Sequence, residues 1–177
     1  MKITITGDVG SGKSTVAKLA AKELKLKYYS TGMMFRKLAA DMQISLKELG
    51  ERAKADKRID KRIDDYQKKL GQIEDDFILE GRLGFHFMPE SIKICLRVKT
   101  EEAAKRIILE SRSDEKFKDL AEATESIKLR RKMERERYKD LYGIDIENND
   151  NYDLIIDTTK IPAVEVAQKI IKYAKKD

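Results

Sequence analysis

The chain has 177 residues, of which 41% are hydrophobic and 40% are charged, so it fits one domain with a substantial core and excludes fibrous, disordered and mini-protein classes. No apolar run approaches the roughly 18 residues of a membrane span, and patterned sequence starts at Met1 without a secretory signal, so we expect a cytoplasmic protein that makes no membrane contact. The net charge of +6 favours anionic partners, but nucleic-acid recognition motifs are not evident, so no nucleic acid is expected as a partner. With one cysteine and one histidine, the chain lacks the ligands for zinc and thiol chemistry.

Five short apolar runs are typical of β-strands, and most of them are separated by segments with helical periodicity. The runs cover residues 2–6, 27–30, 76–80, 91–96 and 152–157. Alternating strands and helices predict an α/β fold in which helices cover a five-stranded parallel sheet. No linker or repeat divides the sequence, so we expect one compact unit over residues 1–177.

The first run ends in a glycine-rich loop that matches the pattern G-x-x-x-x-G-K-S/T and leads into a helical segment. The loop and the helix start comprise Gly7, Asp8, Val9, Gly10, Ser11, Gly12, Lys13, Ser14 and Thr15. The glycines allow a backbone that surrounds phosphate oxygens, and the helix N-terminus adds partial positive charge. Lys13 is expected to reach the β- and γ-phosphates of ATP, and Ser14 to bind Mg²⁺. This motif predicts the three-layer fold of P-loop NTPases.

The second run is followed by a turn and a helix that carry a candidate acceptor-binding arginine. The segment from Tyr29 reads Y-S-T-G-M-M-F-R, which puts Arg36 one turn into the helix, across the crevice from the loop. An arginine there suits bidentate capture of a phosphate on an acceptor. The segment resembles the S/T-x-G-x-x-F/Y-R motif of the cytidylate kinase family, which holds the phosphate of the nucleoside monophosphate. The resemblance implies that Ser30, Gly32 and Arg36 contribute to a CMP site.

The helical stretch between the second and third runs is longer than a simple crossover requires. Ile59, Ile63, Tyr66 and Leu70 recur there at helical spacing, which predicts one apolar face on an otherwise charged helix. We expect a helical insertion over residues 33–72 that stands off the sheet. By the family resemblance, this insertion binds the nucleoside monophosphate.

The third run ends at Glu80, which a glycine and Arg82 follow. The carboxyl ends of parallel strands meet at the ligand crevice, so Glu80 is expected near Mg²⁺ and its waters, with a solvated carboxylate as the alternative. The segment resembles the family's D/E-G-R turn, which makes Arg82 a candidate for holding the acceptor. Many bacterial members carry Asp next, whereas this chain has Leu83. That acceptor contact is therefore missing or comes from elsewhere, with Asp60 or Asp64 as candidates.

The region beyond the fourth run contains the expected lid. In the nucleoside monophosphate kinases that the chain resembles, arginines here contact ATP phosphates or pack on adenine. Arg106 and Arg112 are therefore candidates for ATP binding, with a surface salt bridge as the alternative for each. We place the short lid at residues 111–125, and it lacks the cysteine spacing of a zinc-stabilised lid. The core then comprises residues 1–32, 73–110 and 126–177.

Arg130, Glu134 and Arg137 are spaced so that they share one face of a helix. Two cations and a carboxylate turned toward the crevice can bind phosphate and accept a hydrogen bond from the amino group of cytosine. The trio resembles the family's R-x-x-x-D/E-x-x-R pattern. A solvated charged face is the alternative, because residues 126–139 hold seven basic and two acidic residues.

The resemblance covers essentially the whole chain and is strongest to the short archaeal-type branch of the family. It implies a monomeric kinase that transfers the γ-phosphoryl group of ATP·Mg²⁺ to CMP, with dCMP also accepted. The predicted catalytic residues, which align and neutralise the two phosphate groups, are Lys13, Arg82, Arg130 and Arg137. Two alternatives stay open: a kinase for another small acceptor such as AMP or UMP, and a nucleotide-sensing or RNA-associated P-loop module.

Overall fold

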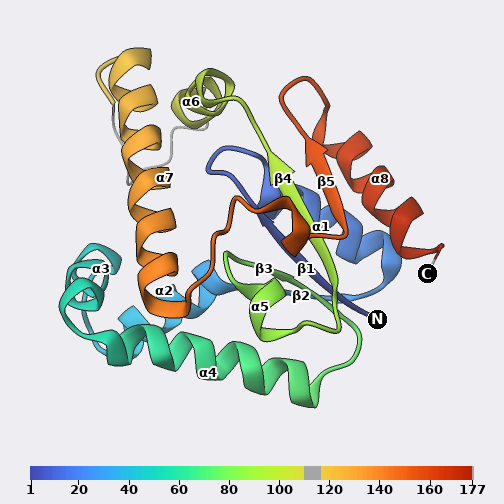
Figure 1. The fold of residues 1–177 in the computed structure, drawn as a ribbon, viewed down its shortest axis with the longest axis horizontal. Coiled ribbons are helices and arrows are strands. Elements are labelled where there is room, and N and C mark those ends of the chain that lie inside the picture. Colours follow the sequence, from blue (N-terminus) through green and yellow to red (C-terminus); the bar gives the residue numbers. More distant parts are fainter. Residues whose placement is uncertain (110–116, 177) are drawn as a thin grey trace.

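A computed structural model describes residues 1–109 and 117–176, and it contains a parallel sheet with helices on both faces (Figure 1). The strands are β1 (Lys2–Gly7), β2 (Lys27–Ser30), β3 (Phe77–Glu80), β4 (Ile92–Arg97) and β5 (Leu154–Asp157). Their order across the sheet is β2-β3-β1-β4-β5, and each neighbouring pair is parallel. All five predicted runs form strands, and the predicted α/β P-loop fold is confirmed.

Helices connect the strands and close the chain. They are α1 (Lys13–Leu24), α2 (Thr31–Asp41), α3 (Leu46–Ala55), α4 (Lys57–Ile73), α5 (Gly84–Phe87), α6 (Thr100–Leu109), α7 (Leu120–Tyr142) and α8 (Ala163–Ala174), with a 3-10 turn η1 (Asn149–Asn151). Side chains of Ser45, Asp56 and Asp119 accept hydrogen bonds from the first turns of α3, α4 and α7. In the part of the chain that the structure describes, none of the helices is long and apolar enough to cross a membrane.

The main core lies between the sheet and helices α1 and α8. Ile3 and Ile5 of β1, Val16 of α1 and Ile170 of α8 are at most 1% exposed. As the middle strand, β1 is covered on both faces, which explains its run of apolar and β-branched residues. Cys95 of β4 is buried, as its apolar surroundings in the sequence predicted, and burial raises the pKa of its thiol to about 11.

Helices α2, α3 and α4 pack around a cluster of their own (Figure 1). Its buried members are Leu38, Ala39, Leu49, Ala53, Ile59 and Ile63. The predicted apolar face of α4 needs one correction, because Tyr66 is 45% exposed whereas its neighbour Gln67 is 3% exposed. A polar residue therefore takes the inward position that the sequence pattern assigned to an aromatic one. That this layer binds the acceptor stays a prediction.

The predicted lid falls only partly within the described residues. Residues 111–116 lie outside them, and residues 120–125 form the start of α7. There Ala123 packs against Ala103 and Ile107 of α6 in a buried cluster that also contains Val9 of the phosphate loop. The first part of α7 is thus attached to α6 and to the loop.

Candidate active site

The phosphate loop joins the central strand β1 directly to the N-terminus of α1. Gly10 and Gly12 have φ values of 74° and 80°, a left-handed backbone that glycine adopts without strain. A Cβ atom on Gly10 would lie 2.8 Å from Ala103 of α6, whereas one on Gly12 would meet nothing within 4 Å. The loop therefore packs against α6 at Gly10, whereas the space beside Gly12 is free of atoms from the described residues. This free space lies beside the partial positive charge of the helix N-terminus.

Other side chains of the loop hold its shape. Val9 packs in the cluster beneath α6, Ser11 is 2% exposed, and Thr15 is exposed on the first turn of α1. Asp8 accepts a hydrogen bond from the backbone N–H of Val98 at 2.9 Å and forms an ion pair with Arg131 of α7 at 3.2 Å. The Asp8 carboxylate thus ties the loop to the segment after β4 and to α7.

Lys13 lies at the start of α1, and its Nζ donates to the Asp8 carbonyl at 2.6 Å. Burial lowers the pKa of Lys13 to about 7, and the charge of Arg82 acts in the same direction. The carboxylates of Glu80 and Glu134 oppose this shift without cancelling it. A phosphate brought to Lys13 would therefore favour the protonated ammonium over the neutral amine.

Ser14 and Glu80 come together from the start of α1 and the end of β3. The Ser14 hydroxyl donates to Glu80 Oε2 at 3.1 Å, and the Tyr28 hydroxyl donates to the same oxygen at 2.8 Å. A hydroxyl beside a carboxylate suits Mg²⁺, which prefers oxygen ligands and completes its shell with phosphate oxygens and waters. No group of three or more His, Cys, Asp or Glu side chains placed to hold a metal occurs among the described residues. The Ser14 hydroxyl and the Glu80 carboxylate fit an ion that takes further oxygen ligands from a nucleotide.

Arg82 connects the phosphate loop to α7. Its guanidinium donates to the Gly7 carbonyl and forms an ion pair with Glu134 at 3.0 Å. Glu134 also pairs with Arg130, one turn earlier on α7, at 3.3 Å. The side chains of Arg82 and Glu134 are 19% and 20% exposed, whereas that of Arg130 is 50% exposed. Of the predicted trio on α7, Glu134 therefore faces the loop, and Arg130 lies closer to solvent.

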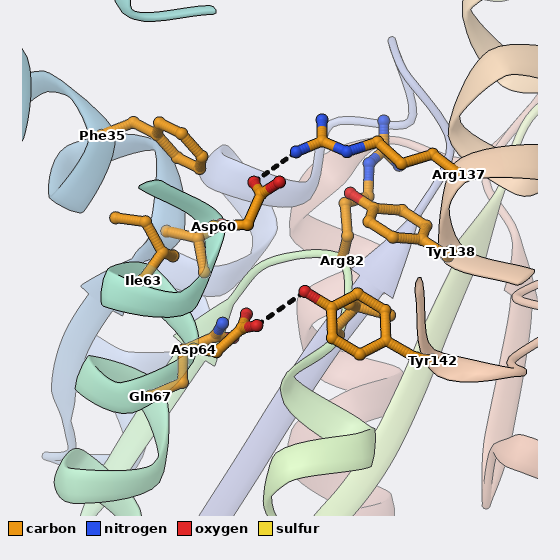
Figure 2. Close-up of a pocket in the computed structure, with 11 residues that line it drawn as sticks. Phe35, Asp60, Ile63, Asp64, Gln67, Arg82, Arg137, Tyr138 and Tyr142 are labelled. Carbon is orange, nitrogen blue, oxygen red and sulfur yellow. Dashed lines mark hydrogen bonds and ion pairs between the residues drawn. The ribbon is translucent and has the colours of Figure 1, made fainter. Parts of the chain in front are cut away.

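Arg137 extends from α7 toward α4 and forms an ion pair with Asp60 (Figure 2). Burial acts to lower the pKa of Arg137, but the hydrogen bond and the charge of Asp60 outweigh it and raise the pKa. The pair links the helical layer of α2, α3 and α4 to the long helix α7.

Arg36 lies on α2, and its guanidinium lies close to Gly32 at the start of the same helix. A Cβ atom added to Gly32 would be 3.8 Å from the Nη2 atom of Arg36. No hydrogen bond or ion pair of Arg36 is found among the described residues. Ser30, which precedes the helix, is 6% exposed. The motif at the end of β2 thus provides a guanidinium whose donors are available.

Arg106 lies on α6 behind the phosphate loop. Its guanidinium donates to the carbonyls of Thr158 at 2.7 Å, Thr159 at 3.1 Å and Gly10 at 3.4 Å. These bonds tie the loop to the segment after β5, and a role in ATP binding stays a prediction. Arg112 lies outside the described residues.

A pocket of about 130 Å³ lies between α4 and α7 (Figure 2). Its lining comprises Asp60, Ile63, Asp64 and Gln67 of α4, Arg137, Tyr138 and Tyr142 of α7, and Thr31, Phe35, Arg82 and Leu83. The Tyr142 hydroxyl donates to Asp64 Oδ2 at 2.6 Å. The pocket combines two guanidiniums with aromatic and apolar side chains, which suits a ligand that carries both a phosphate and a ring.

Several residues at the site were not singled out from the sequence. Tyr28, Gln67 and Tyr142 contribute polar atoms, and Arg131 donates to the Val98 carbonyl at 2.9 Å and fastens α7 beside the loop. Gln67 could have been found, because it recurs four residues after Ile63 on a face that is otherwise apolar. Arg131 could not, because it sits in a basic run whose members look alike in the sequence.

Comparison with known proteins identifies relatives of the whole chain. Residues 2–160 match the model of a family described as the cytidylate kinase-like family. The chain is 37% identical to a cytidylate kinase of Archaeoglobus fulgidus over 173 residues, which cover 97% of this chain and 93% of that one. It is 38% identical to a cytidylate kinase of Sulfolobus acidocaldarius over 174 residues, which cover 97% and 92%.

A third relative is a longer protein. The chain is 37% identical over 176 residues to an S-adenosylmethionine-dependent nucleotide dehydratase of Lacinutrix mariniflava. The match covers 99% of this chain but spans only 36% of the dehydratase. The chain is therefore similar to one part of that protein.

Solved structures with low sequence identity share the fold. An uncharacterized protein from Eubacterium ventriosum gives a TM-score of 0.74 at 23% identity, covering 100% of this chain and 99% of that one. A shikimate kinase from Bacteroides thetaiotaomicron gives 0.65 at 15% identity, covering 99% and 98%. At these identities the similarity shows the fold alone.

Proposed function

Because this chain belongs to the cytidylate kinase-like family, we propose that it transfers the γ-phosphoryl group of ATP to CMP, with dCMP as a further acceptor. One observation carries the proposal, namely the position of Arg82. Its guanidinium contacts the Gly7 carbonyl in the phosphate loop and also lines the pocket between α4 and α7. A donor nucleotide in the loop and an acceptor nucleotide in the pocket would therefore share one cation between their phosphate groups.

On the donor side, Lys13 and the N-terminus of α1 would bind the β- and γ-phosphates of ATP. Ser14 and Glu80 would hold Mg²⁺, which neutralises charge on the phosphate oxygens when it is bound. The lowered pKa of Lys13 supports this role, because a bound phosphate would raise that pKa and so complete the protonation of the side chain.

On the acceptor side, Arg36, Arg82 and Arg137 would bind the phosphate of CMP. Two of them are paired with carboxylates, Arg82 with Glu134 and Arg137 with Asp60, and a phosphate would replace these partners in part. An oxygen of the CMP phosphate then attacks the γ-phosphorus in line, while the bond from that phosphorus to the bridging oxygen of ADP breaks. The attacking oxygen is already ionised at neutral pH, so alignment and charge neutralisation suffice without a general base.

The dehydratase relative supports a nucleotide as the substrate class. That protein is named for a reaction on nucleotides, and a part of it is similar to 99% of this chain. The dehydratase activity itself is not proposed for this chain, because the match covers only 36% of that protein.

A coupled assay of ADP release with ATP and Mg²⁺ tests the proposal across CMP, dCMP, UMP and AMP. We expect ADP release to depend on CMP or dCMP and CDP or dCDP to accumulate in equal amount. ADP release that AMP alone stimulates would show that AMP, and not CMP, is the acceptor. ADP release that no monophosphate stimulates would overturn the kinase assignment.

A further inference from the structure

We propose that Asp64 and Gln67 of α4 form the base-reading edge of the acceptor pocket and select a one-ring base with an exocyclic amino group, cytosine, over uracil. The inference rests on the proposed nucleotide kinase function and adds the residues that set its specificity. It starts from a buried polar group that the protein itself leaves unsatisfied.

Gln67 is an anomaly in the packing of α4. It lies on the inward face with Ile59, Ile63 and Leu70, and it is 3% exposed. Its Oε1 atom is buried and has no hydrogen-bond partner among the described residues. Burying an amide without a partner is unfavourable, so an aliphatic residue would suit a purely structural face better. Because Gln67 also lines the pocket, a polar group of the ligand is the natural partner for it.

Asp64 stands one turn before Gln67 on the same side of α4, and both line the pocket. The hydroxyl of Tyr142 donates to Asp64 Oδ2 at 2.6 Å and so fixes the carboxylate from the opposite helix (Figure 2). Oδ1 of Asp64 makes no hydrogen bond to any residue that the structure describes. The hydroxyl hydrogen of Tyr142 is used in this hydrogen bond, so Tyr142 has no hydrogen left to donate to a ligand. Asp64 Oδ1 and Gln67 Oε1 therefore present hydrogen-bond acceptors to the ligand.

Asp64 differs from the other acid in the pocket. Asp60 is paired with the Arg137 guanidinium, whereas the partner of Asp64 is a neutral hydroxyl. The charged end of the pocket, with Arg82 and Arg137, therefore suits the phosphate. The end formed by Asp64 and Gln67 is left for a group that donates hydrogen bonds.

An exocyclic amino group matches this edge. It carries two hydrogens, and Asp64 Oδ1 and Gln67 Oε1 offer two acceptors. Uracil has a carbonyl oxygen at the same position, which would face the carboxylate of Asp64 without a hydrogen between them. The Gln67 amide can turn to donate to either base, so Asp64 is the residue that discriminates between them and Gln67 the one that adds affinity.

The size of the pocket fits a one-ring base such as cytosine. The pocket measures about 130 Å³, and a cavity of about 150 Å³ is known to hold one benzene ring. Phe35, Ile63 and Leu83 supply apolar surface for the faces of such a ring.

Binding of CMP and UMP to the full chain, measured by calorimetry without ATP, tests the edge directly. The variants are Asp64→Asn, which replaces acceptor oxygens by an amide of the same shape, and Gln67→Met, which removes the polar group at similar length. Asp65→Asn is the matched control, because it removes the same charge from the neighbouring, exposed position on α4.

We expect the wild type and Asp65→Asn to bind CMP at least about tenfold more tightly than UMP. Asp64→Asn should lower this ratio about tenfold or more, because it weakens CMP binding and admits UMP. Gln67→Met should weaken binding of both nucleotides. Equal ratios in Asp64→Asn and Asp65→Asn, or an equal loss of both ligands in Asp64→Asn, would overturn the base-reading role.

Turnover with ATP and each monophosphate separates this inference from the proposed function. Phosphoryl transfer to CMP with a CMP-to-UMP ratio that Asp64→Asn leaves unchanged would refute the inference and keep the kinase assignment. Preferential CMP binding that depends on Asp64, without phosphoryl transfer in the wild type, would refute the kinase assignment and keep the inference. Failure of both monophosphates to bind the wild type would overturn both.

Discussion

The phosphate loop and the pocket between α4 and α7 are built in contrasting ways. The loop consists of consecutive residues, Gly7–Ser14, and its backbone is set by glycines, by Asp8 and by the packing of Val9. The pocket takes its residues from α2, α4, α7 and the turn after β3. A contiguous motif therefore fixes one half of the site, whereas tertiary packing alone brings the other half together.

The two regions also differ in how their cations are balanced. The ammonium of Lys13 is bonded to a backbone carbonyl, and burial keeps its pKa low. The guanidiniums of Arg82 and Arg137 instead have carboxylate partners. In the proposed function, Lys13 would gain a charged partner from a bound phosphate, whereas an acceptor phosphate would have to compete with Glu134 and Asp60 for Arg82 and Arg137. Under the proposed function, binding energy at the loop and selectivity at the pocket would arise from different parts of the fold, which Arg82 connects.

The largest effect is expected at the loop. Lys13→Ala should lower kcat about a hundred- to a thousandfold, because it removes a cation that acts on the transferred phosphoryl group. Circular dichroism should show a fold that is unchanged. Lys22→Ala, on the exposed side of the same helix, is the matched control and should retain wild-type turnover. Similar rates in the two variants would contradict the role of Lys13.

A smaller effect, confined to the acceptor, is expected at the pocket. Arg137→Ala should raise KM for CMP about ten- to a hundredfold, the range for a lost hydrogen bond to a charged group, and leave KM for ATP nearly unchanged. Steady-state kinetics with each substrate varied in turn measures both constants. Arg135→Ala is the control, because Arg135 pairs with Asp145 at 2.7 Å outside the pocket. An equal rise in both constants would show that the two regions are not separate.

The smallest expected effect is the uptake of a proton by Lys13 when ATP binds. The pKa of Lys13 is lowered to about 7, so the free protein carries mostly neutral amine at pH 8, and a bound phosphate raises the pKa again. ATP binding should therefore take up about 0.9 proton at pH 8 and about 0.1 at pH 6 from this group, so affinity weakens as pH rises. Calorimetry in buffers of different ionisation enthalpy measures the uptake.

Lys13→Arg provides the control for this experiment, because a guanidinium stays charged at both pH values. Its ATP binding should take up no proton at pH 8. Equal uptake by the two proteins would mean that another group supplies the change.

Most of the fold could be predicted from the sequence because its signals are local. The five apolar runs and the glycine loop are each contained in a short stretch, and every one of these runs forms a strand. The face of α4 was predicted less well. Helical spacing placed Tyr66 inward, but Gln67 is buried in its place, since packing against the neighbouring helices decides between adjacent residues on a wide apolar face.

The candidate site shows the same division. Ser14 and Glu80 were expected together, because strand ends and helix starts converge in a parallel sheet, and they share a hydrogen bond. The pairing of Arg137 with Asp60 depends on how α7 crosses α4, which no local pattern reveals. Motif spacing therefore located the cations, and only the tertiary structure identified their partners.

The separate hydrophobic cluster of α2, α3 and α4 has an evolutionary consequence. Under the proposed function, substitutions in this cluster would alter which small molecule is accepted, while the glycine loop, whose Val9 packs in a different cluster, would keep its shape. Selection could thus diversify the acceptor half of the proposed kinase while conserving the donor half.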